Sequence, residues 1–264
     1  MAAFLFNPKR AAVIGVVHLK PLPGSPRWYD NFKNLIKAAV TDAKAFQQSG
    51  ADAIIIENFG DIPFNKVGVA PETLASMAAA GCAVRDAVDL PIGFNVLRND
   101  AHAALALSAA CGGSFIRVNV HCGAMLTDQG IIEGKAYETL RLKKSLCPQT
   151  QIFADVHVKH AVPLGNWSLE DAARDTMERG LADALIISGA GTGLITNLAD
   201  VKRARASCHN AKILIGSGIT VANVRDFLPF INGVIVGSSL KRGGKLENPV
   251  DAKRVATLVK QIAA

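Results

Sequence analysis

Short apolar runs alternate with amphipathic stretches along the whole chain. Each run has about four to seven residues, a length typical of strands that are buried on both faces of a parallel sheet. The stretches between them have the polar and apolar spacing of helices packed on one face. The eight predicted strands are Ala12–His18, Ala53–Asn58, Ile92–Leu97, Phe115–His121, Ile152–His157, Ala184–Ser188, Lys212–Gly216 and Val234–Gly237. The eight predicted helices are Asn31–Gln48, Pro71–Val88, Ala101–Ala110, Lys135–Leu146, Leu169–Arg179, Asn197–Ala206, Val221–Leu228 and Pro249–Ile262.

Strands that alternate with helices predict βαβ units and a parallel sheet. Eight such repeats in 264 residues favour closure into a barrel over an open sheet, because a (β/α)8 barrel typically takes ~250 residues. No linker or shift in composition divides the chain. We therefore predict an α/β fold, a single (β/α)8 TIM barrel domain that covers residues 1–264.

Composition narrows the class of protein. Hydrophobic residues make up 50% of the chain and charged residues 19%, which is enough for a large core and excludes a disordered chain. No apolar run reaches the ~18 residues of a membrane span, and the first ten residues are too short for a secretory signal. The five cysteines form no CxxC pair and are odd in number, as expected of reduced thiols in a cytoplasmic protein.

The net charge of +7 comes from scattered basic residues. The densest basic runs, at residues 202–205 and 241–242, contain no aromatic residues, which disfavours nucleic acid and favours an anionic small ligand or an acidic partner. The acids and histidines lack the spacing of a metal motif. We expect no metal and no cofactor.

Polar triplets at the ends of the fourth and fifth strands are the first sign of a site. Active sites of this fold lie at the carboxyl ends of the strands, and side chains on a strand alternate between two faces. Each triplet should therefore share one face and point into the barrel mouth. An alternative is a self-satisfied network that plugs the barrel, and both can hold together. The triplets are Arg117, Asn119 and His121, and Asp155, His157 and Lys159.

Glycine-rich segments follow the last three predicted strands. Backbone amides of such loops often bind phosphate after the seventh and eighth strands of a barrel, although tight turns alone would also require glycine. The segment after the sixth strand, residues 188–193, adds further amide donors or a lid. The predicted phosphate ligands are Ser188, Gly189, Gly191, Thr192, Gly193, Gly216, Ser217, Gly218, Gly237 and Ser238.

The remaining strand ends complete the predicted site. In such a site a carboxylate can act as a general base and a histidine can donate a proton. A lysine can either stabilise developing negative charge or form a Schiff base. The predicted catalytic residues are Asp155, His157, Lys159, Glu57, Asn119 and His18. The predicted substrate-binding residues are Asn58, Asn95, Arg117 and His121.

Several of these segments together resemble the BtpA/SgcQ family over nearly the whole chain. They are the segment from Val17 to Pro26, "ENFGDIPF" from Glu57, "FNVLRND" from Phe94, "FIRVNV" from Phe115, "ADVHVKHA" from Ala154 and "IGSGIT" from Ile215. The resemblance implies a TIM barrel related to phosphate-binding barrels. It marks the following as motif positions without assigning them roles: His18, Glu57, Asn58, Asp61, Asn95, Arg98, Asn119, Asp155, His157, Lys159 and His160. Ser188 stands where relatives more often have threonine, and either hydroxyl can donate to a phosphate.

The resemblance leaves two functions open. One branch of the family looks like a sugar-metabolism enzyme, which fits an enzyme acting on a phosphorylated sugar or nucleotide-like metabolite. The namesake is implicated in the stability of photosystem I proteins, which fits a non-catalytic assembly factor associated peripherally with a membrane. Three glycine-rich segments at one rim favour the enzyme. We also expect a homo-oligomer, with the alanine-rich helices at residues 75–83 and 101–110 as candidate contact surfaces.

Overall fold

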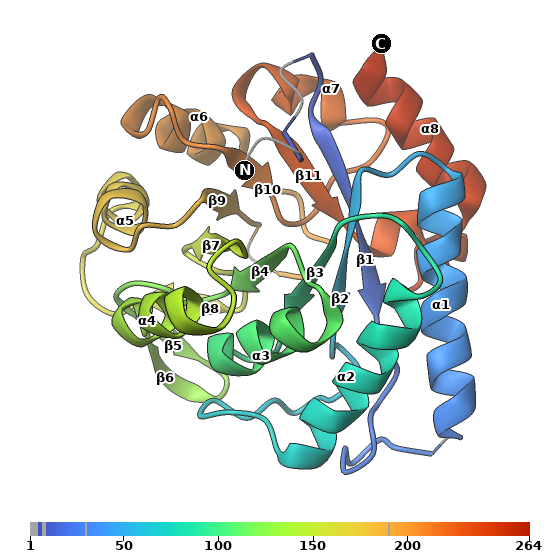
Figure 1. The fold of residues 1–264 in the computed structure, drawn as a ribbon. Coiled ribbons are helices and arrows are strands. Elements are labelled where there is room, and N and C mark those ends of the chain that lie inside the picture. Colours follow the sequence, from blue (N-terminus) through green and yellow to red (C-terminus); the bar gives the residue numbers. More distant parts are fainter. Residues whose placement is uncertain (1–4, 7–8, 30, 190) are drawn as a thin grey trace.

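The computed structural model describes residues 5–6, 9–29, 31–189 and 191–264. The first ten residues, on which the expectation about a secretory signal rests, lie partly outside the described residues. Within the described residues, eight parallel strands close into a barrel in the order β1-β11-β10-β9-β7-β4-β3-β2, which confirms the predicted fold (Figure 1). The strands are β1 (Ala12–His18), β2 (Ala53–Glu57), β3 (Ile92–Asn95), β4 (Phe115–Val118), β7 (Gln151–Val156), β9 (Ala184–Ile187), β10 (Ile213–Ile215) and β11 (Gly233–Val236).

Helices surround the barrel close to their predicted positions (Figure 1). Several of them begin where a polar side chain accepts a hydrogen bond from a first-turn amide, as Asn31, Ser168 and Asp251 do. The α-helices are α1 (Phe32–Gln48), α2 (Pro71–Arg85), α3 (Ala101–Cys111), α4 (Ala136–Leu146), α5 (Leu169–Arg174), α6 (Leu198–Ser207), α7 (Val224–Phe227) and α8 (Ala252–Ala263). Shorter turns are the π-helical η1 (Asp175–Arg179) and the 3-10 segments η2 (Leu228–Phe230), η3 (Ser238–Leu240) and η4 (Arg242–Gly244).

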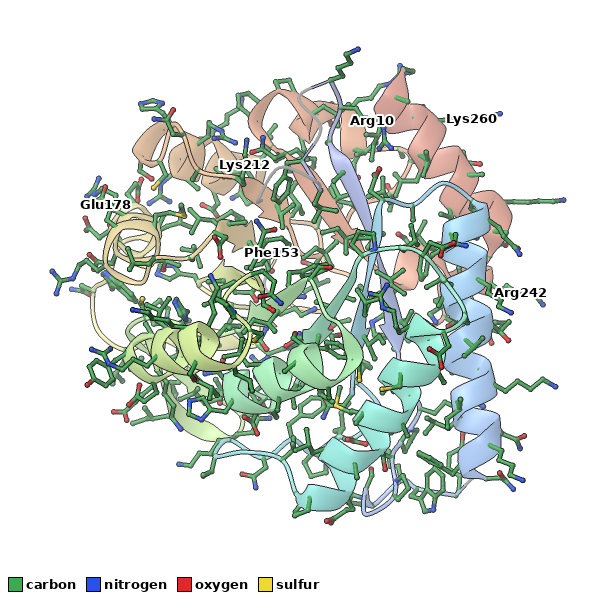
Figure 2. All side chains as sticks on the ribbon, viewed as in Figure 1. Arg10, Phe153, Glu178, Lys212, Arg242 and Lys260 are labelled. Atoms are coloured by element: carbon green, nitrogen blue, oxygen red, sulfur yellow. The ribbon has the colours of Figure 1, made fainter. Side chains whose placement is uncertain are left out.

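The core has two layers because each barrel strand is buried on both faces. The rings of Phe115 and Phe153 stack inside the barrel with centroids 4.7 Å apart. Figure 2 shows Phe153 near the centre of the molecule, whereas charged side chains such as Arg10 and Lys260 lie at its periphery. A second layer packs between strands and helices, with Phe46 of α1 fully buried in it. This arrangement leaves polar side chains room only at the barrel's ends.

A small antiparallel sheet, which the sequence pattern did not predict, lies outside the barrel. Its order is β6-β5-β8, and its strands are β5 (Ala124–Thr127), β6 (Gly130–Glu133) and β8 (Ala161–Pro163). It is formed by the segments that follow β4 and β7. Met125 and Ile132 pack with Val120 and Val158 beneath it. The sheet therefore shapes the rim on the side of β4 and β7.

Two expectations about the surface of the fold bear on function. No helix among the described residues is long and apolar enough to cross a membrane. The alanine-rich helices are partly used inside the chain, because Ala80 of α2 and Ala103 and Ala104 of α3 are buried. Self-association stays a prediction.

Candidate active site

A buried ion pair forms the floor of the barrel mouth. Arg117 on β4 donates to both carboxylate oxygens of Asp155 on β7, at 2.8 Å each. Asn119 Nδ2 donates to the same carboxylate at 3.0 Å and Ser188 Oγ at 3.1 Å. Burial disfavours the charged guanidinium, but the charge and hydrogen bonds of Asp155 raise the pKa of Arg117. The carboxylate accepts all of these hydrogen bonds and borders neither of the mouth cavities described below, so the catalytic role of Asp155 stays a prediction.

Glu57, at the end of β2, is the carboxylate that faces the cavity. Its Oε1 lies 3.7 Å from Nη1 of Arg117 and accepts a hydrogen bond from Asn95 Nδ2, and its Oε2 lies 3.8 Å from Nε2 of His18. Burial would raise the pKa of Glu57, but Arg117, His18, Lys159 and the Asn95 hydrogen bond together lower it. Glu57 is therefore an ionised carboxylate at neutral pH.

His18 ends β1 beside Glu57. Burial lowers the pKa of this imidazole to about 4, although the charge of Glu57 opposes the shift. His18 is therefore neutral at neutral pH, and its predicted catalytic role stays a prediction. Its Nδ1 is buried without a hydrogen-bond partner among the described residues.

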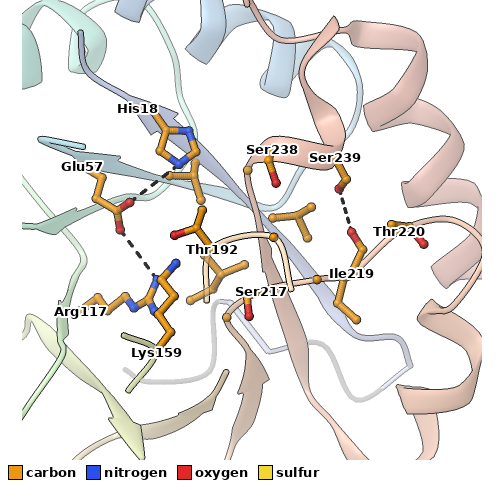
Figure 3. Close-up of a pocket in the computed structure, with 17 residues that line it drawn as sticks. His18, Glu57, Arg117, Lys159, Thr192, Ser217, Ile219, Thr220, Ser238 and Ser239 are labelled. Carbon is orange, nitrogen blue, oxygen red and sulfur yellow. Dashed lines mark hydrogen bonds and ion pairs between the residues drawn. The ribbon is translucent and has the colours of Figure 1, made fainter. Parts of the chain in front are cut away.

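Lys159 lies in the segment after β7. Together with Arg117, Asp155 and Glu57 it forms the charged cluster of the barrel mouth. Burial lowers the pKa of its ammonium, Arg117 and Arg98 lower it further, and Glu57 and Asp155 oppose them. Figure 3 shows Lys159 beside Arg117, with the carboxylate of Glu57 between Arg117 and His18. A carboxylate and a lysine with a lowered pKa thus face the same space.

A small cavity of about 60 Å³ separates this cluster from the glycine-rich segments after β9, β10 and β11. Ser239 Oγ donates to the carbonyl of Ile219 at 2.7 Å and ties two of these segments together (Figure 3). The amides of Gly218, Ser238 and Ser239 have no hydrogen-bond acceptor among the residues that the structure describes. These residues and their neighbours form the cradle, which comprises Thr192, Gly193, Gly216, Ser217, Gly218, Ile219, Thr220, Gly237, Ser238 and Ser239.

Two glycines of the cradle cannot carry a side chain. Gly218 has a φ of 72°, and a Cβ there would lie 2.3 Å from the carbonyl oxygen of Leu194. A Cβ on Gly237 would lie 2.4 Å from Cε1 of His18. Close approach between the cradle and the charged cluster therefore depends on glycine.

A second, larger cavity of about 530 Å³ opens over the ends of β2, β3 and β4. Its walls are mainly apolar, and it shares Glu57, Lys159 and Thr192 with the first cavity. The remaining side chains that border it are Phe59, Ile62, Phe64, Asn95, Leu97, Arg98, Asn119, Asp128 and His160.

Two histidines predicted for the site lie elsewhere. β4 ends at Val118 and β7 at Val156, so side-chain alternation does not extend to either residue. His121 is buried, and its Nε2 donates to the carbonyl of Gly180 at 2.8 Å. His157 has a φ of 50°, packs against Trp167, and borders a separate cavity next to α6. Burial lowers the pKa of both imidazoles.

Four other predicted binding residues do not border the two mouth cavities. The amide of Asn58 accepts from Leu97 N at 2.7 Å and donates to the carbonyl of Leu97 and to Asp61, so it fixes the segment after β3. Ser188 and Gly189 border the cavity next to α6, and Gly191 lies beside His160. Ala190 lies outside the described residues. These positions shape the site without facing the cradle.

Several lining residues were missed from the sequence. Thr220 and Ser239 directly follow predicted glycine segments, so a wider window around those segments would have included them. Phe59, Ile62 and Phe64 lie in the segment after β2, where no periodicity indicates which side chains face inward. No group of three or more His, Cys, Asp or Glu side chains in the described part of the chain is arranged to hold a metal ion.

Comparison with known proteins places the chain among close relatives. Residues 9–264 match the model of the BtpA family. "Photosystem I biogenesis protein BtpA" of Synechocystis is 47% identical over 95% of this chain and 88% of its own. An uncharacterized Pyrococcus furiosus protein is 46% identical over 94% of this chain and 93% of its own. A chain of Mycobacterium tuberculosis tryptophan synthase aligns with a TM-score of 0.64 at 18% identity, covering 97% of this chain and 94% of that one, which is a likeness of fold alone.

Proposed function

This chain belongs to the BtpA family, and from that premise and the geometry of its barrel mouth we propose that it is an enzyme. Its substrate is a phosphorylated sugar or a nucleotide-like metabolite. The reaction uses acid/base chemistry at the carboxyl ends of the barrel strands. The cradle binds the phosphate, and the charged cluster acts on the carbon skeleton.

One observation carries the proposal. An ionised carboxylate, Glu57, and a lysine of lowered pKa, Lys159, face backbone amides of the cradle that have no acceptor in the described part of the chain, across a cavity of about 60 Å³. Amides without acceptors near a helical turn favour an anion such as phosphate. Buried charged groups that border a cavity are costly to fold and are typical of functional sites.

Each residue has a role that its surroundings support. Glu57 accepts a proton from the substrate, and Arg117, held by Asp155, keeps that carboxylate ionised and oriented. Lys159 faces the negative charge that develops on an oxygen and returns a proton to it. His18, neutral at physiological pH, supplies a hydrogen bond without adding charge.

Exchange of carbon-bound protons tests this function. Phosphorylated aldoses and ketoses are incubated with the protein in D2O, and proton NMR follows the loss of carbon-bound hydrogen. We expect exchange with at least one sugar phosphate and a loss of about 100-fold or more in Glu57→Gln, since general acid–base groups contribute ~10²–10⁴ in rate. Glu138→Gln, the same change on exposed α4, should leave exchange intact. Unchanged exchange in Glu57→Gln, or none with any sugar phosphate, contradicts the proposal.

The name of the Synechocystis relative supports a second candidate, a factor for photosystem I biogenesis. Such a factor, associated peripherally with a membrane, would act through its outer surface. It should co-sediment with membranes at low salt and be released at high salt. A Glu57→Gln variant would keep this association, whereas the enzyme proposal ties function to the mouth.

A further inference from the structure

The two cavities of the mouth are adjacent. Glu57, Lys159 and Thr192 border both of them. The cradle therefore lies on one side of the reacting groups, and the larger cavity lies on the other side. A ligand held by its phosphate and in contact with Glu57 would extend into the cavity of about 530 Å³.

The walls of that cavity select an apolar, flat group. Phe59, Ile62, Phe64 and Leu97 present hydrocarbon to it. The Phe59 ring packs edge-on against the imidazole of His18, with centroids 5.0 Å apart, which holds it at the border of the reacting groups. Aromatic rings bind well against such aromatic and aliphatic walls. A short phosphorylated sugar alone would leave these walls exposed to water.

Two buried oxygens set a further requirement on the ligand. The Nδ2 group of Asn95 donates a hydrogen bond to Glu57, and the Nδ2 group of Asn119 donates one to Asp155. Because carboxylates only accept hydrogen bonds, these contacts fix the orientation of both amides and leave both Oδ1 atoms as acceptors. Both oxygens are buried without a donor among the described residues, and both side chains border the larger cavity. A ligand that supplies hydroxyl or N–H donors would satisfy them.

We propose that the substrate is a phosphate monoester whose far end is an aromatic ring, with a hydroxyl-bearing segment between the two. The ring binds among Phe59, Ile62, Phe64 and Leu97, and the hydroxyls donate to Asn95 and Asn119. This inference rests on the proposed function, since it takes the cradle as the phosphate site. It adds the ring and the donor groups, which the cradle alone does not specify.

Calorimetric titration of the wild-type chain with matched probes tests the inference. The probes are ribose 5-phosphate, phenyl β-D-ribofuranoside 5-phosphate, its 2,3-dideoxy analogue, and the phenyl riboside without phosphate. We expect the phenyl riboside phosphate to bind at least tenfold more tightly than ribose 5-phosphate. The dideoxy analogue should bind at least tenfold more weakly than its parent, because buried oxygens are left unpaired. The probe without phosphate should lose most of the affinity.

Paired variants locate the ring. Phe64 is half-buried at the mouth, and Phe230 is half-buried in η2 before β11, at the opposite end of the barrel. Phe64→Ala should abolish the gain from the ring, whereas Phe230→Ala should keep it. Equal affinity for the ribosides with and without the ring, or a gain that survives in Phe64→Ala, overturns this inference while the phosphate site stands. If no phosphorylated probe binds, the proposed function fails and the inference fails with it.

Discussion

Arg117 donates 2.8 Å hydrogen bonds to both carboxylate oxygens of Asp155 inside the barrel. Both side chains are almost completely buried, so the ion pair is shielded from water. The same guanidinium lies 3.7 Å from Glu57. One structural pair thus sets the charge of the proposed general base, and disturbing it should affect stability as well as chemistry.

Arg117→Met should destabilise the protein by about 3–5 kcal/mol, because it removes one partner of a buried ion pair and leaves the other without its hydrogen bonds. Arg203→Met provides the control. Arg203 pairs with Glu170 on the surface, where its side chain is 50% exposed, and such pairs contribute little to stability. Urea unfolding measures both free energies of unfolding. Equal losses in the two variants would show that the buried pair is not the stronger one.

The lowered pKa of Lys159 should appear as unusual reactivity. Burial is the largest cause of the shift, and the neutral amine, which is the reactive form, therefore becomes populated at a lower pH than in free lysine. Reductive methylation with formaldehyde and cyanoborohydride, followed by peptide mass spectrometry, gives the rate at each lysine across pH. The midpoint for Lys159 should lie below that of free lysine methylated under the same conditions.

Glu57→Gln sharpens this measurement. The charge of Glu57 raises the pKa of Lys159, so its removal should move the Lys159 midpoint further down. A Lys159 midpoint that matches free lysine in the wild type, or that rises in Glu57→Gln, would contradict the electrostatics described for the mouth.

His18 should make stability depend on pH. Its pKa is lowered from 6.5 to about 4 in the fold, so the unfolded chain binds more protons between these values, and stability falls as pH drops from 6.5 to 4. The full contribution is about 3 kcal/mol at ~1.4 kcal/mol per pH unit. We expect wild type to lose about that much more than His18→Asn across this window, measured by urea unfolding. His209→Asn, an exposed control, should keep the wild-type slope.

The barrel could be predicted because each of its strands is a short apolar run between helices, a pattern that few folds share. The β6-β5-β8 sheet could not. Ala124–Thr127 and Gly130–Glu133 are short and partly exposed, so they lack the continuous apolar character of the barrel strands. These two strands pair with each other as a local hairpin after β4, and β5 also pairs with β8 from the segment after β7.

The site was predictable where it follows strand geometry. Arg117 on β4 and Asn119, the first residue after it, both reach Asp155, as alternation along the strand suggested. The rule failed at His121, three residues beyond the end of β4, and at His157, where a φ of 50° turns the backbone out of the strand. The aromatic wall of the larger cavity lies in a loop, where sequence carries no comparable periodic signal.

Charge, and not only shape, should decide whether the cradle binds its ligand. Ser238 lies in the first turn of η3, where its amide and that of Ser239 lack acceptors among the described residues, and its hydroxyl lies near Gly193. Ser238→Asp places a carboxylate where the phosphate is proposed to bind. Ser238→Asn has nearly the same shape and no charge.

Ribose 5-phosphate at about 100 times its dissociation constant should stabilise the wild-type chain by about 2.7 kcal/mol, because it binds only the folded state. The rise in melting temperature in a thermal-shift assay measures this gain in stability. Ser238→Asp should lose it, since like charges at contact repel even beside the surface. Ser238→Asn should retain most of it. If both variants lose the shift equally, the side chain is excluded by size and the cradle is not selecting for an anion. If neither loses it, the phosphate binds elsewhere, and the opposition of Glu57 and Lys159 to the cradle no longer explains where the reaction occurs.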